Sequence, residues 1–153
     1  MANVVFNIAK GRVVELYNRV KSNDPANSAL ILVPIETVGL EADASLIDVD
    51  TLTALLAGTT NEQTTMGRKV LTDADLAALP APDDTNDRYD ISLPTVTWTA
   101  ATGNAISKIA VCYDSDTTAG TDANIIPLTM FDFVVVPDGS DLQMTGGVFF
   151  RAS

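Results

Sequence analysis

The sequence predicts an α+β protein, in which an N-terminal amphipathic helix and a short second helix pack on an antiparallel β-sheet or small β-sandwich. Helical spacing of apolar residues dominates up to Gly58, and strand-like alternation follows it. The chain contains 16 Asp but only 4 Glu, and Asp favours caps and turns over helix interiors. Helices that precede the strands, instead of alternating with them, favour α+β over α/β.

The N-terminus predicts an extended arm followed by a helix. Residues 1–7 are the arm, because Val4, Val5 and Phe6 are apolar but have no helical period. The helix is expected from Ile8 to Lys21. Its apolar face, at i, i+3, i+4 and i+7, consists of Val13, Leu16, Tyr17 and Val20.

Two apolar segments follow. The continuous run ALILVPIE, residues 29–36, predicts a buried strand, with Pro34 at an edge or strand end because proline cannot donate to a ladder. DVDTLTALLAG predicts a two-turn helix, with Asp50 as its N-cap and Gly58 just past its end.

The remaining segments predict strands, about six to eight in all, within a single domain of residues 1–153. Strand patterns occur in TTMGRKVL, RYDISL, TVTW, ISKIAVCY, FDFVVV and GGVFFRAS, and DADLAAL predicts one helical turn. Pro-Asp-Gly after FDFVVV predicts a hairpin. The residues expected to be buried are Leu16, Val20, Leu30, Leu32, Ile91, Trp98, Ile109, Val111, Phe133 and Val135.

Composition excludes several classes of protein. Apolar residues make up 46% of the 153, which is enough for a core. The longest apolar stretch, ALILVPI, is too short to span a bilayer, and the N-terminus lacks the pattern of a secretory signal. The net charge of −11 argues against nucleic-acid binding. We therefore expect a protein that is made and kept in the cytosol or assembled there, with no membrane or nucleic-acid partner.

The residues that most enzymes need are missing or isolated. The chain has no His, so Ser-His-Asp and Cys-His catalysis and His-ligated metals are excluded. The single Cys, Cys112, lies on an expected strand and reads as a small buried hydrophobe. No phosphate-binding glycine loop is present. The sequence thus predicts no catalytic residues, no cofactor and no small-molecule substrate.

The loop CYDSDTTAGTD, residues 112–122, carries Asp114, Asp116 and Asp122 and raises the question of a calcium site. An EF-hand loop started at Asp114 would have Ala119 where glycine is needed and Ile125 where the bidentate glutamate belongs. The interpretation favoured here is a turn whose Asp and Thr side chains cap its own amides, with no bound metal. A looser oxygen cage is the alternative.

Charge is divided unevenly along the chain. In the first 21 residues four basic residues stand against one acid, giving +3, whereas the rest carries five against nineteen, giving −14. The sequence predicts a partner-contact surface in this segment, made of Val4, Val5, Phe6, Lys10 and Arg12, in which the apolar arm is buried and the cations steer it. Two alternatives are an arm folded across its own sheet as an edge strand, and a solvated basic helix face.

Several long stretches resemble small acidic structural proteins of tailed bacteriophages. The similarity covers nearly the whole chain and includes AKGRVVELYNRVKSNDPANSALILVPIE, TNEQTTMGRKVLTDADL, DDTNDRYDISLPTVTWTAATGN, VCYDSDTTAGTDANIIPLTMFDFVVVPDGSDL and the ending FFRAS. The resemblance implies a non-enzymatic component of the virion and assigns no functional residues.

Three functions are open within this reading. The first is a capsid decoration or cement protein on the head exterior, bound to the major capsid protein or other virion proteins and forming a homo-oligomer. The second is a head–tail connector or tail subunit. The third is a β-rich carbohydrate-binding module for host attachment. It ranks last, because aromatic residues are only 6% of the chain and the alternation of Trp98 with Val96 favours a core or interface position over a sugar platform.

Overall fold

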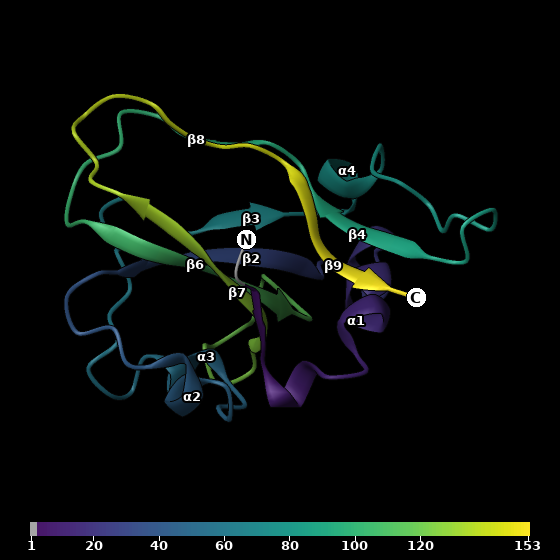
Figure 1. Cartoon of the computed structure of the whole chain (residues 1–153), viewed down its shortest axis with the longest axis horizontal. Coiled ribbons are helices and arrows are strands. Elements are labelled where there is room, and N and C mark those ends of the chain that lie inside the picture. The colour runs from purple at the N-terminus through teal and green to yellow at the C-terminus, as the bar shows by residue number, and fades with distance from the viewer. Residues whose placement is uncertain (1–2) are drawn as a thin grey trace.

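The computed structural model describes residues 3–153 and shows the predicted α+β class. Its main feature is a five-stranded antiparallel sheet with the strand order β1-β7-β6-β2-β3 (Figure 1). These strands are β1 (Asn3–Val5), β2 (Ala29–Glu36), β3 (Lys69–Leu71), β6 (Ile106–Asp114) and β7 (Ile126–Val135). The long central strands β2 and β6 are buried almost throughout, as their apolar runs predict.

A two-stranded ribbon makes a second layer. One side consists of β4 (Tyr89–Leu93) and β5 (Val96–Trp98), and the other of β8 (Leu142–Met144) and β9 (Gly147–Ala152). β4 pairs with β9 and β5 pairs with β8, both antiparallel. The ribbon is interrupted at Gly146, where a Cβ atom would come within 2.6 Å of the Leu93 carbonyl oxygen. Only glycine permits that approach without a backbone shift.

Short helices surround the two layers. They are the 3-10 helix η1 (Asn7–Ala9) and the α-helices α1 (Val13–Lys21), α2 (Asp43–Leu46), α3 (Leu52–Leu55) and α4 (Asp73–Leu76). In Figure 1, α1 and α4 lie on the same side as β4 and β9, whereas α2 and α3 lie towards the lower left. Tyr17 of α1 packs edge-on against Tyr89, with ring centroids 6.3 Å apart, and also contacts Phe149.

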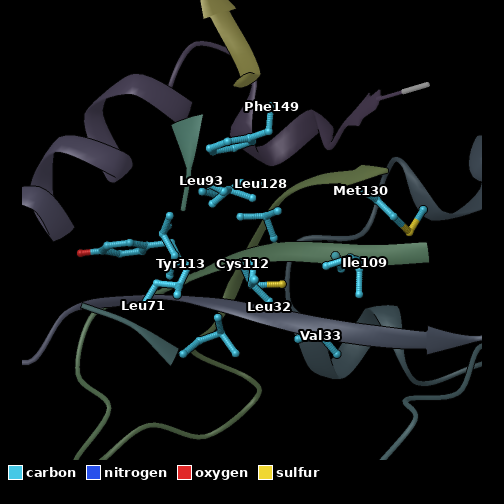
Figure 2. Close-up of a cluster of buried hydrophobic side chains, with 14 of the residues drawn as sticks. Leu32, Val33, Leu71, Leu93, Ile109, Cys112, Tyr113, Leu128, Met130 and Phe149 are labelled. Atoms are coloured by element: carbon cyan, nitrogen blue, oxygen red, sulfur yellow. The ribbon is translucent and has the colours of Figure 1, made fainter. Parts of the chain in front are cut away.

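The core lies between the sheet and the ribbon. Figure 2 shows Leu93 and Phe149 of the ribbon above Tyr113, Cys112 and Leu128 of the sheet. All five of these side chains are buried. Eight of the ten predicted core residues are buried as well, whereas Phe133 and Val135 are only partly buried and pack at the margin of the core.

The predicted N-terminal helix begins five residues late. Residues 8–12 form part of η1 and a turn in which Gly11 has a φ of +82°, a left-handed conformation that ends any helical run. The α-helix therefore starts at Val13 and keeps the predicted apolar face.

The predicted second helix is shorter and begins differently. It spans a single turn, and its N-cap is Thr51 instead of Asp50, because the Thr51 hydroxyl accepts a hydrogen bond from the Ala54 amide at 3.1 Å. α2 was not predicted. The helical turn predicted at DADLAAL is confirmed as α4.

Two strand predictions are also corrected. The Pro-Asp-Gly turn does not form a hairpin, because β8 pairs with β5 instead of β7. Pro34 lies inside β2, opposite Ile109, and not at a strand end. The Pro34 carbonyl faces Gln63, beyond the end of β3, and the N–H and C=O of a strand residue point to the same side. The missing donor therefore removes no hydrogen bond from the ladder between β2 and β6.

Candidate interaction surface

The N-terminal segment is an edge strand of its own sheet. In β1, Val4 is paired with Met130 and Val5 with Thr129. Phe6 is fully buried, and its amide donates to the Leu128 carbonyl at 3.0 Å. For the described residues the structure thus shows the alternative of an arm folded across its own sheet as an edge strand, in place of a free extended arm, and Phe6 belongs to the core. Residues 1–2 of the predicted arm lie outside the described residues.

Four residues of the predicted contact surface are still accessible. Val4 and Val5 are half-buried, and Lys10 is exposed. The Arg12 side chain is 44% exposed and lies 3.9 Å from Glu15. Within residues 3–153 Lys10 forms no salt bridge, and no strand pairs with the outer edge of β1. Whether these residues contact another chain stays a prediction.

The aspartate loop has the geometry of a turn. The Asp114 carboxylate accepts a hydrogen bond from the Asp116 amide at 3.0 Å. The Asp116 carboxylate accepts from the hydroxyl of Thr118 at 2.6 Å and from its amide at 3.0 Å, and these bonds lower the pKa of Asp116. A Cβ at Gly120 would lie 2.9 Å from Asp114, so the loop is closely packed. These contacts fit the expected amide-capping role.

Asp122 belongs to a different arrangement, a clamp around Arg68. The Arg68 guanidinium donates to both oxygens of Asp122, at 2.6 and 2.8 Å, and to both oxygens of Glu62, at 2.8 and 2.6 Å. The Arg68 hydrogen bond lowers the pKa of Asp122, and the two carboxylates raise the pKa of Arg68. The clamp ties the β6–β7 loop to the segment before β3. Sequence reasoning missed it, because Arg68 and Asp122 are 54 residues apart and no local pattern joins them.

A second ion-pair group fixes α2 to the sheet. Lys108 of β6 is only 9% exposed, and its ammonium group lies 2.7 Å from Asp132 of β7 and 3.2 Å from Asp43 of α2. Burial alone would lower the pKa of Lys108, but the two carboxylates outweigh it and raise the pKa. This buried charge thus has partners on two other elements.

Cys112 and the aromatic residues point inward. Cys112 is fully buried, and burial raises the pKa of its thiol. Of the nine aromatic residues, seven are buried and two, Phe133 and Phe150, are partly buried. Trp98 is 1% exposed, and its indole N–H donates to the Gly67 carbonyl at 2.9 Å. Trp98 and six other rings are therefore covered by the protein itself, and only Phe133 and Phe150 are partly accessible.

The described residues offer few other sites. Among residues 3–153 no three His, Cys, Asp or Glu side chains are grouped so as to hold a metal ion. No helix in this range is both long enough and apolar enough to cross a bilayer. An open hollow of about 370 Å³ lies beside Asp83, Asp87, Arg88 and Tyr89. Of its acids, Asp83 is engaged locally, since it accepts hydrogen bonds from Asn86 and lies 3.9 Å from Arg88.

Comparisons with known protein families, with curated proteins and with solved structures found no match for this chain.

Proposed function

We propose that this chain is a non-enzymatic structural protein of a tailed-phage virion, and that it decorates the head exterior by binding the major capsid protein. The observation that carries the proposal is the outer edge of β1. There half-buried Val4 and Val5 lie next to an unpaired strand edge, and the exposed Lys10 follows η1. Native proteins usually cover or charge such an edge. An uncovered one fits a protein that works by contact.

Charge supports the same role. The chain carries −11 overall, yet Lys10 makes no salt bridge within residues 3–153. An exposed cation in the segment that follows the strand would steer that edge towards an acidic partner surface and set its register. The resemblance to phage structural proteins is the reason for proposing a virion as the particle. The edge of the sheet is the surface through which we propose that the protein attaches to it.

Mass spectrometry of purified particles, from a phage whose genome encodes this chain, tests the proposal. A decoration protein should be present in copy numbers comparable to those of the major capsid protein, and gold-labelled antibodies should mark the heads. Label confined to the neck or tail would instead support the connector or tail alternative. Absence from the particles would refute the virion role.

A further inference from the structure

The last residues of β7 and Val136, which follows the strand, extend past β1 on one side; residues 132–136 are named here the β7 tip. β1 pairs only with Thr129, Met130 and Phe131. Beyond that point no strand within residues 3–153 pairs with β7 on the β1 side. β6 continues on the other side, where Ile106 is paired with Val135. Among residues 3–153 the tip therefore has a paired edge on the β6 side and no paired strand on the other side.

The outward face of the β7 tip is apolar. Alternate residues of a strand point to opposite faces. Phe133 and Val135 point inward, and the Phe133 ring lies 6.5 Å from that of Trp98. Val134 and Val136 point outward and are 80% and 70% exposed. A single exposed valine is ordinary. Two at alternate positions, next to an edge without a paired strand among the described residues, form a surface on which an extended segment can bind as an added strand.

The charge around the tip indicates what that segment carries. From Phe131 to Asp141 the chain has three aspartates and no Lys or Arg. Asp132 is compensated by Lys108. The carboxylates of Asp138 and Asp141 accept hydrogen bonds from Ser140 and from the Ala100 amide, which are neutral groups. Their negative charges are thus available to cations on a partner.

We propose that the β7 tip binds, by strand addition, an extended segment of a different protein in which apolar side chains alternate with Lys or Arg. A second copy of this chain is disfavoured, because a two-fold contact at the tip would bring the same aspartates together. The inference rests on the contact role proposed above and adds a second contact with its own chemistry. The peptide-binding test needs no particle. The β7-tip proposal can therefore fail while the virion role stands, and the virion role can fail while peptide binding at the tip is observed.

The test uses the full-length protein and a synthetic peptide, acetyl-Lys-Val-Lys-Val-Lys-Val-amide, with titrations followed by NMR and calorimetry. We expect the amide signals of Val134, Val135 and Val136 to shift on binding. Affinity should fall by about tenfold or more in the Val134→Ser/Val136→Ser double variant, because the buried apolar contact is lost. Raising the salt concentration should also weaken binding, because the steering charges are screened.

Two controls separate this site from general stickiness. Val38→Ser removes a valine that is 75% exposed in the turn after β2, and it should leave peptide binding unchanged. A peptide with Glu in place of Lys should bind more weakly by about tenfold or more, because like charges repel. The NMR signals that shift in the wild-type protein locate the binding site, so this part of the test holds even if the double variant folds poorly.

Three results would overturn the proposal. One is that the Lys peptide does not bind, or shifts signals elsewhere. Another is that the wild-type protein binds the Glu peptide as tightly as the Lys peptide, or that the double variant binds the Lys peptide as tightly as the wild type does. The third is self-association of the wild-type protein that the double variant abolishes, since this would assign the tip to a second copy.

Discussion

At the scale of single residues, removal of the Arg68 side chain should lower the free energy of unfolding, because two carboxylates lose their shared partner. Breaking a buried ion pair costs about 3–5 kcal/mol, and the partial exposure of Arg68 reduces the expected loss to about 2 kcal/mol for Arg68→Ala. Glu62, whose side chain is 11% exposed, would lose its partner. The measurement is urea unfolding. Arg19→Ala is the matched control, because its pair with Glu15 is solvent-exposed, and it should cost under about 0.5 kcal/mol.

The Arg68 clamp also predicts a pH dependence. The pKa of Asp122 is lower in the folded protein than its ordinary value. The stabilisation is therefore complete above the unfolded pKa of about 3.9 and is lost as the pH falls through the lower, folded-state pKa. The difference in unfolding free energy between the wild type and Arg68→Ala should shrink as the pH falls below about 4. A difference that stays constant from neutral pH to acid would contradict this assignment.

Phe6 tests the corrected view of the N-terminus. Because Phe6 is fully buried, Phe6→Ala should destabilise the protein by about 3–5 kcal/mol. Val4→Ser, at a half-buried position of β1, should cost distinctly less. Equal, small effects on thermal unfolding would mean that the segment is detached from the sheet in solution.

At the scale of elements, the ribbon depends on the close passage at Gly146. A Cβ there would meet Leu93 and Pro94 backbone atoms at 2.6 and 2.7 Å, so Gly146→Ala should cost roughly 1–3 kcal/mol through the forced backbone shift. The adjacent Gly147 has no atom within 4 Å of its Cβ position, and Gly147→Ala should be nearly neutral. Chemical denaturation compares the pair. Similar losses in the free energy of unfolding for both variants would show that Gly146 does not pass close to the backbone of Leu93 and Pro94.

The elements that the sequence predicted are those specified locally. The apolar run of β2 and the alternation of β4 are decided by residues within the segment, and both strands are confirmed. What could not be predicted depends on long-range pairing. β8 pairs with β5, with Met144 opposite Val96, and the residues of the turn after β7 cannot reveal this partner. The Arg68 clamp and the burial of Phe6 could not be predicted either, because both depend on contacts between residues far apart in the sequence.

At the scale of the whole molecule, the two contact regions that we propose lie at the same edge of the five-stranded sheet. β1 is the outermost strand, and the β7 tip lies beyond its end, so a partner could engage both together. The apolar content of 46% and the unpaired outer edge of β1, but not the acidic β7 tip, lead us to expect a homo-oligomer in solution or on the particle. Analytical ultracentrifugation showing only monomer at micromolar concentrations would contradict self-association in solution, though not the virion role.

The most direct test of the virion role is add-back binding to bare heads, prepared from the encoding phage after deletion of this protein's coding sequence. The purified protein should bind saturably, and cryo-electron microscopy should show new density on the head exterior. Lys10→Glu should keep the fold, because Lys10 is exposed and forms no salt bridge within residues 3–153, but should slow binding. We predict head binding that depends on Lys10. Failure to bind the heads, or binding only at the neck or tail, would contradict a decoration role.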